Sequence, residues 1–205
     1  MAGNEQVMKL RFLVLMPLLA LCTGAFADDF EEGRAAYDQG DYATAILRYE
    51  KAADYGHEGA QYNLAVMYHE GDGVPRDRAQ AVFWYTKAAQ QGNALSQVWL
   101  GIMHREGLGT PRDYGESRYW FTRAANQGNS DAQFALGQIH FYGTGYPKNN
   151  IKAYLWFYLA GSQGDRDAEA MIPTLEQHLT PGQVAEAKRL VREWESRWRT
   201  GDLQD

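Results

Sequence analysis

Residues 57–92 read HEGAQYNLAVMYHEGDGVPRDRAQAVFWYTKAAQQG, and two further copies of this pattern follow without a break at residues 93–128 and 129–164. The copies have the same length and keep the same residue types at matching positions. The shared positions are a leucine (Leu64, Leu100, Leu136), a Gly-x-Gly pair (Gly71/Gly73, Gly107/Gly109, Gly143/Gly145), a tryptophan (Trp84, Trp120, Trp156) and a closing glycine (Gly92, Gly128, Gly164). Self-similarity at a fixed period of this length predicts a solenoid of stacked repeats.

Each copy predicts a pair of helices. Apolar residues recur at helical spacing on both sides of the Gly-x-Gly pair, whose glycines can take the positive φ that follows a helix. Asp77, Asp113 and Asn149 stand where the second helix needs an N-cap, and Gln80 and Glu116 three residues on predict capping boxes. A helix of about 12 to 14 residues is marginal alone in water, so its apolar stripe must pack on its partner and on the next copy. We therefore predict an all-α fold, a right-handed α-solenoid of stacked helix pairs, with the tryptophans in the core.

Different segments flank the three copies. Residues 28–56 match them at most positions with a shorter loop, which predicts a shortened, tetratricopeptide-like first repeat. Residues 165–205 predict C-terminal capping helices and a tail: a helix interrupted near Pro173, then a long amphipathic helix that begins at a Thr180–Gln183 capping box and covers the open end of the stack. Residues 200–205 are expected to fray.

Residues 1–27 predict a signal peptide. Lys9 and Arg11 precede an apolar run over residues 12–21, and Ala25-Phe26-Ala27 supplies the small residues that precede a cleavage site, placed before Asp28. Met8 is an alternative start, because the signal is complete without the residues before it. We expect the mature protein to be periplasmic or secreted.

Two alternatives for this segment are weaker. A membrane anchor would need about 20 apolar residues, more than the run contains. A lipoprotein would use Cys22, but Leu21 stands where its signal should carry a small residue. Cys22 is the only cysteine, so cleavage would leave a chain that can form neither a disulfide nor a thiolate metal site.

The mature chain is acidic. Without Glu5, Lys9 and Arg11 it keeps 18 of the 20 basic and 25 of the 26 acidic side chains, a net charge of −7. This charge argues against binding nucleic acid or anionic lipid through bulk electrostatics, and it favours a basic partner if charge contributes. We expect no insertion into the membrane after cleavage.

No catalytic motif is present. Ser-x-x-Lys, a Walker phosphate loop, His-Glu-x-x-His and Gly-x-Ser-x-Gly are all missing from the sequence. Asp77 and Asp113 are explained by helix capping. His104 and His140 share one repeat position, but two ligands make a poor zinc site, and we expect partly buried structural histidines. We predict no catalytic, cofactor-binding or metal-binding residues.

The string LxxxYxxGxGVxxDxxxAxxWYxKAAxxG in residues 57–92 resembles the unit of the Sel-one-like repeat family, relatives of tetratricopeptide repeats with longer loops. The resemblance covers residues 31–164, and the C-terminal LTPGQVAEAKRLVREW is similar to the end of many exported bacterial members. It implies an adaptor that holds other proteins. His104 and His140 depart from the usual tyrosine, and Gly145-Tyr146-Pro147 departs from the usual Gly-Val step.

In related helical solenoids the first helices of successive repeats line a concave groove. If Leu64 and Tyr68 point into the repeat, helical geometry turns one set of neighbours toward that groove. The predicted partner-binding residues are Tyr62, Val66, His69, Glu70, Val98, Ile102, Arg105, Glu106, Phe134, Gln138, Phe141 and Tyr142. They are more aromatic and aliphatic than a surface facing only water, which favours an interaction site. The alternative is that several of them pack against the neighbouring repeat.

We expect a monomeric, non-catalytic adaptor or regulator of the bacterial envelope that binds another protein in this groove. The partner could be an envelope protein, the outer domain of a sensor or a toxic effector. One alternative is an immunity-type inhibitor that covers the active site of a toxic effector. A third, weaker hypothesis is a hydrolase acting on cell-wall or small-molecule substrates.

Overall fold

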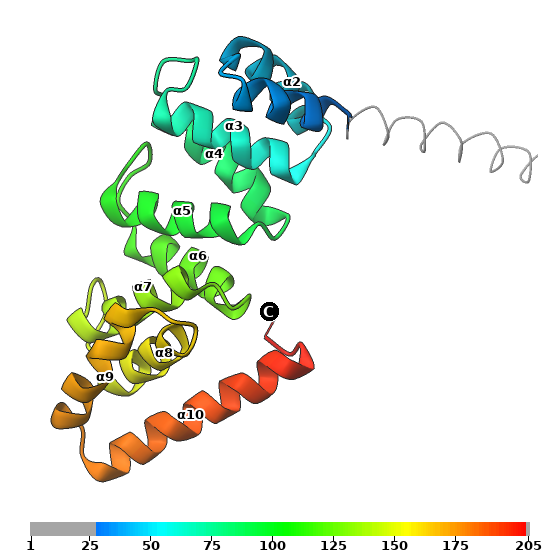
Figure 1. Cartoon of the computed structure of the whole chain (residues 1–205). Helices are drawn as coiled ribbons and strands as arrows, with labels where there is room; N and C mark the ends of the chain where they lie inside the picture. The colour runs from blue at the N-terminus through cyan, green and yellow to red at the C-terminus, as the bar shows by residue number, and fades with distance from the viewer. Residues whose placement is uncertain (1–27, 204–205) are drawn as a thin grey trace, which may run out of the picture. The chain divides into compact units, whose positions relative to one another are not determined.

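The computed structural model describes residues 28–203, and within this range the chain forms helices and no strands (Figure 1). The predicted signal peptide, residues 1–27, lies outside the described residues. A first helix covers residues 28–38. The helices that follow are α2 (Tyr42–Asp54), α3 (Glu58–Glu70), α4 (Arg78–Gln90), α5 (Ala94–Glu106), α6 (Tyr114–Asn126), α7 (Ser130–Tyr142), α8 (Asn150–Ser162), α9 (Arg166–His178) and α10 (Pro181–Thr200).

The helices form the predicted pairs. Helices α2 to α9 are each 13 residues long, and α3/α4, α5/α6 and α7/α8 correspond to the three full copies of the repeat. Helix α5 packs on α6, α6 on α7 and α7 on α8, and the long helix α10 packs on α8. The all-α prediction of stacked helix pairs with a C-terminal capping helix is confirmed.

The helices group into two compact units that divide within α4, after Lys87. The first unit has a buried cluster built around Tyr49, Leu64 and Met67 from α2 and α3, with Trp84 of α4 packed half-buried against it. Its core is therefore made by the first helix, α2 and α3, with the middle of α4 packed against it.

The second unit, from Ala88 onward, has a buried cluster that joins Phe121 of α6, Leu136 of α7 and Trp156 of α8. Trp120 of α6 is also buried. The repeat tryptophans therefore pack in the core. Trp120 and Trp156 are buried in this unit, and Trp84 is half-buried in the first.

The ends of the helices follow the predicted chemistry. Gly71, Gly107 and Gly143 are C-caps with φ of 87°, 71° and 74°. The side-chain oxygens of Asp77, Asp113 and Asn149 accept hydrogen bonds from backbone N–H groups in the first turns of α4, α6 and α8. These contacts satisfy donors that have no partner within the helix.

The capping boxes predicted at Gln80 and Glu116 are wrong. The backbone N–H of Asp77 donates to the Tyr68 carbonyl at 2.9 Å, and that of Asp113 donates to the His104 carbonyl at 2.8 Å. Because each N-cap N–H already has a partner in the preceding helix, the Gln80 and Glu116 side chains have no such donor to accept from. The loop is instead closed onto the end of the first helix.

The second position of the Gly-x-Gly pair requires glycine for two reasons: its φ is positive, and a neighbouring side chain leaves no room for a Cβ. Gly73 and Gly145 have φ of 74° and 71°. A Cβ at Gly73 would collide with Cβ of Tyr42, and one at Gly145 would lie 2.5 Å from Cβ of Tyr114. The loop of one pair therefore lies directly on the second helix of the preceding pair.

The C-terminal helices differ from the prediction at one point. Helix α9 continues through Pro173, where an interruption was expected. Proline has no backbone N–H, so the Glu169 carbonyl loses the helical hydrogen bond that residue 173 would donate. Both residues are exposed, so water can donate to this carbonyl instead. The capping box at Thr180 and Gln183, which begins α10, is confirmed.

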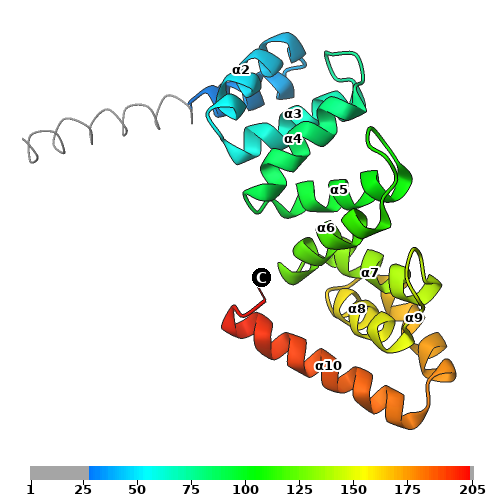
Figure 2. The ribbon, with the colours of Figure 1, turned by 180° about the vertical axis from the view of Figure 1, so that it is seen from behind.

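The end of the chain is more ordered than predicted. Gly201 ends α10 in the left-handed conformation, and Leu203 is buried. The Asn126 side-chain amide of α6 donates to the Leu203 carbonyl at 3.1 Å. The expectation that residues 200–205 fray is therefore wrong as far as Leu203. Figures 1 and 2 both show α10 running from the end of α9 back along the second unit toward α6.

Candidate protein-binding surfaces

In the first unit, the predicted surface on α3 is half-buried. The Tyr62 and His69 rings lie 6.0 Å and 6.3 Å from the buried Tyr85 ring of α4. Burial lowers the pKa of His69. Glu70 is exposed, and Val66 is half-buried. Both rings are therefore only partly exposed, and they lie against the buried Tyr85 ring.

In the second unit, α5 contributes a mixed patch. Ile102 is half-buried. The Arg105 guanidinium lies 5.7 Å from the centre of the buried Phe121 ring, and its Nε donates to Glu106 Oε1 at 2.8 Å. Stacking on a ring and pairing with a carboxylate restrict this arginine, which lowers the entropy cost of using it in an interface.

Val98 does not belong to an exposed surface. It is only 8% exposed and belongs to the buried cluster of the second unit, which includes Phe121 of its partner helix α6. The expectation that Val98 faces a groove is therefore wrong.

Helix α7 carries the most exposed aromatic residue of the predicted set. Tyr142 is 60% exposed, and its ring lies 5.0 Å from that of Phe141. Phe134 and Phe141 are half-buried, with ring centres 5.5 Å and 6.5 Å from the buried Phe157 of α8. Gln138 on the same helix is half-buried. Rigidly supported aromatic side chains with exposed edges are typical of binding hot spots.

A second set of exposed apolar residues, at one repeat position, was not predicted. Leu47 of α2, Phe83 of α4 and Tyr119 of α6 are 63%, 48% and 49% exposed. They share one repeat position, so their spacing of 36 residues could have identified them. The fourth member, Leu155 of α8, is only 8% exposed because α10 covers it.

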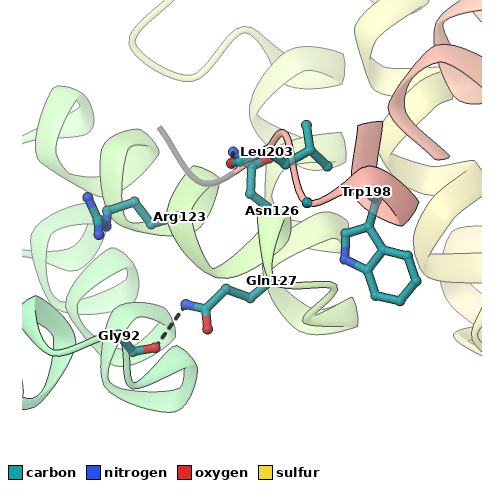
Figure 3. Close-up of a pocket in the computed structure, with 7 residues that line it drawn as sticks. Gly92, Arg123, Asn126, Gln127, Trp198 and Leu203 are labelled. Atoms are coloured by element: carbon teal, nitrogen blue, oxygen red, sulfur yellow. Dashed lines mark hydrogen bonds between the residues drawn. The ribbon is translucent and has the colours of Figure 1, made fainter. Parts of the chain in front are cut away.

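Two cavities lie beside α10 in the second unit. The first, about 440 Å³, is lined by Gly92, by Arg123, Asn126 and Gln127 around the end of α6, and by Trp198, Gly201 and Leu203 (Figure 3). The Gln127 Nε2 donates to the Gly92 carbonyl at 2.9 Å. The second, about 530 Å³, lies between α6, α7, α8 and Leu190 of α10.

One histidine contacts the second cavity. His140 is 8% exposed, and burial together with the positive charges of Lys152 and Arg118 lowers its pKa to about 4. His104, its equivalent, is half-buried. Among residues 28–203 no three or more His, Cys, Asp or Glu side chains come together as metal ligands would. Within the same range no helix has both the length and the apolar character to span a membrane.

Three consecutive segments, residues 59–93, 94–129 and 130–165, each match the Sel1 repeat. The chain belongs to the Sel1 repeat family. Its repeats are offset by one or two residues from the copies at 57–92, 93–128 and 129–164. Proteins built from Sel1 repeats mediate interactions between proteins, and their fold is generally a non-catalytic scaffold.

Two solved structures share this fold. A Sel1 repeat protein from Oxalobacter formigenes is 32% identical with a TM-score of 0.68, over 72% of this chain and 62% of that one. A protective antigen with an SLR fold from uropathogenic Escherichia coli is 26% identical with a TM-score of 0.51, over 87% of this chain and 47% of that one.

One curated relative has a described role. A segment of 50 residues is 44% identical to an exopolysaccharide production negative regulator of Rhizobium leguminosarum bv. viciae. The match covers 24% of this Sel1 repeat chain and 19% of that regulator.

Proposed function

We propose that this Sel1 repeat protein is a non-catalytic adaptor or regulator of the bacterial envelope that binds a partner protein through the first helices of its repeats. The observation that carries the proposal is the α5 and α7 surface of the second unit. There the exposed Tyr142, the half-buried Phe134 and Phe141, and the ring-stacked Arg105 are held on the buried Phe121 and Phe157. Aromatic residues and arginine on a rigid base are the composition of an interface core.

Two further arguments support the regulatory and envelope parts of the proposal. The 50-residue match to a negative regulator of exopolysaccharide production favours a regulatory role over a purely structural one. The basic, apolar and small-residue pattern of residues 1–27 supports export to the periplasm or beyond.

An immunity-type inhibitor is the alternative within the same class, and it would use the same surface to cover the active site of a toxic effector. The two roles differ in affinity and stoichiometry. An inhibitor should hold one protein at about nanomolar Kd and abolish its activity, whereas a regulator should bind an envelope protein or sensor domain more weakly and reversibly.

The test uses a variant that leaves the core intact. Tyr142→Ala combined with Arg105→Ala removes the exposed ring and the stacked guanidinium without touching Phe134 or Phe141, which support the fold. Tyr158→Ala on α8 is the matched control, because Tyr158 is 40% exposed and lies on a second helix, away from this surface.

Partners captured from an envelope extract by the wild-type mature protein are identified, and their Kd values are measured for each variant. The double variant should lose about 30-fold or more in affinity for the main partner, the loss expected of a hot spot, while Tyr158→Ala binds normally. If a correctly folded double variant keeps its full affinity for the partner, the first-helix surface does not bind that partner. Substrate turnover abolished by changing one polar side chain would instead identify the hydrolase.

A further inference from the structure

The larger cavity of the second unit has an apolar floor and a basic rim. Its floor is formed by Leu136, Leu155, Trp156 and Leu190, contributed by α7, α8 and α10. Its rim carries Arg118 and Arg123 of α6 and Lys152 of α8. Among residues 28–203, no aspartate or glutamate lines this cavity or the smaller one beside it.

The basic side chains at this rim have no acidic partner among residues 28–203. Arg118, Arg123 and Lys152 form no ion pair within 4.0 Å there, whereas Arg105 forms one and Arg48 and Arg189 form two each. Two of the three are held by aromatic rings instead. The Arg118 guanidinium lies 3.8 Å from the centre of the Tyr146 ring, and Arg123 Nη1 donates to the Tyr119 hydroxyl at 3.3 Å.

The sequence contains 26 acidic and 20 basic side chains, so the chain as a whole is negative. Three cations around one cavity with no carboxylate make a local positive potential inside a negative protein. The positive charges of Lys152 and Arg118 also contribute to the low pKa of the neighbouring His140.

The two cavities are neighbours, because both are lined by Arg123 and Asn126. The larger one, lined by residues of α6, α7, α8 and α10, is called the channel from here on. Figure 3 shows Arg123 at one side of the smaller cavity and the Trp198 ring at the other, with Asn126 and Gln127 between them. Tyr119 is 49% exposed in the wall of the larger cavity.

We propose that this channel binds a segment of a partner protein in which carboxylates alternate with apolar side chains. The unpaired cations match the carboxylates, and the leucine and tryptophan floor matches the apolar side chains. An anionic polysaccharide or a nucleic acid would pair with the rim but leave the apolar floor without complementary groups. The site lies on α6, α7, α8 and α10, and its lining contains none of the residues of the first-helix surface proposed above.

The probe is a short fluorescent peptide in which Glu and Leu alternate, titrated against the mature protein. Two control peptides replace Leu with Ser, which keeps the negative charge without the apolar side chains, or Glu with Lys, which keeps the apolar side chains and reverses the charge. We expect the Glu–Leu peptide to bind about tenfold or more tightly than either control, and its affinity to fall as NaCl is raised to about 0.5 M.

Charge reversal tests the location. Arg123→Glu with Lys152→Glu should weaken binding of the Glu–Leu peptide by about tenfold or more, because both cations become repulsive. Arg166→Glu on α9 reverses the charge of one exposed residue outside the channel and should leave the affinity within about twofold. The Tyr142→Ala, Arg105→Ala variant should also bind this peptide normally, which separates this site from the first-helix surface.

Four outcomes would overturn the proposal. Equal binding of the Glu–Ser peptide or of polygalacturonate would show simple attraction of anions, and equal binding of the Lys–Leu peptide would show that the site does not select for negative charge. Unchanged affinity in the Arg123→Glu, Lys152→Glu variant would place the peptide elsewhere. If that variant unfolds, crosslinking decides: a photoreactive group on the peptide should label α6, α7, α8 or α10 of the wild-type protein, and labelling only of other helices overturns the proposal.

Discussion

At the scale of single residues, a glycine in the middle of a first helix makes room for a buried aromatic ring. A Cβ added to Gly101 would lie 2.7 Å from the Phe121 ring, and one added to Gly137 would lie 2.6 Å from the Phe157 ring. Both rings are 1% exposed. They support Arg105 and the α7 aromatics, so these glycines position the proposed binding surface.

We therefore predict that Gly137→Ala destabilises the protein. In an exposed helix this change stabilises by about 1 kcal/mol, but here the added methyl group meets a ring that cannot move away, and overpacking of a core costs about 1 to 3 kcal/mol. Urea unfolding followed by circular dichroism measures the difference.

Gly182→Ala in α10 is the control, because a Cβ there meets nothing within 4 Å. It should leave the free energy of unfolding unchanged or raise it slightly. A Gly137→Ala protein as stable as the wild type would mean that the α7–α8 contact is looser than the structure indicates.

His140 predicts a dependence of stability on pH. Its folded pKa of about 4 lies below its ordinary value of 6.5. Between these values the unfolded chain binds a proton that the folded chain does not, so stability is full above about pH 6.5 and falls as the pH drops toward 4. His140→Gln should remove about 1 to 2 kcal/mol of the loss between pH 7 and pH 5, measured by urea unfolding at both values. Identical pH profiles of the two proteins would contradict this assignment.

At the scale of helices, buried glutamines connect the repeats. Gln61, Gln97 and Gln133 share one repeat position, and each side-chain amide donates to a carbonyl at the end of the preceding helix, from Ala53, Ala89 and Ala125. Gln163 Nε2 donates to Gln133 Oε1 at 2.8 Å and extends the connection. Their repeat spacing was visible in the sequence, but a glutamine in an exposed turn has the same pattern, so only the packing shows that they are buried.

Helix α10 protects the apolar face of α8. Val191 is 4% exposed and belongs to the same buried cluster as Leu155 and Trp156. We predict that Val191→Asp releases α10, because an unpaired carboxylate in that cluster costs several kcal/mol. Binding of the dye ANS should rise. Circular dichroism should show that most of the helical content of the protein remains, because α5 to α8 stay folded.

Arg192→Asp is the control for this change, because Arg192 is the next residue on α10 and is exposed. It should not increase ANS binding. Val191→Asp should also weaken binding of the Glu–Leu peptide, because α10 forms one wall of the channel. Unchanged ANS binding in Val191→Asp would mean that α10 is not held by this cluster.

At the scale of the whole molecule, export remains a prediction from residues 1–27. We expect the full chain, expressed in a Gram-negative host, to be recovered from the periplasm as a protein that begins at Asp28. Mass spectrometry of the intact protein and N-terminal sequencing measure the cleavage point. Ala27→Arg should block cleavage, because the peptidase requires a small residue there. Recovery of an unprocessed wild-type chain from the cytoplasm would contradict the envelope role.

The repeat period determined most of the fold. Three copies with apolar residues at helical spacing, Gly-x-Gly pairs and capping residues such as Asp113 are sufficient to specify helix pairs, because these signals act within one turn or one loop. The same local signals could not predict which group accepts a hydrogen bond from the Asp113 backbone N–H. The acceptor is the His104 carbonyl, and it comes within reach only because of the way the loop returns to the first helix.

The tertiary structure decided which apolar residues remain available to a partner. Val98 and Ile102 have similar character and lie on the same helix, yet Val98 is buried in the cluster of the second unit and Ile102 is half-exposed. Tyr119 and Leu155 occupy one repeat position, and α10 covers only Leu155. Exposure depends on contacts between helices far apart in the chain, and a local sequence pattern carries no information about those distances.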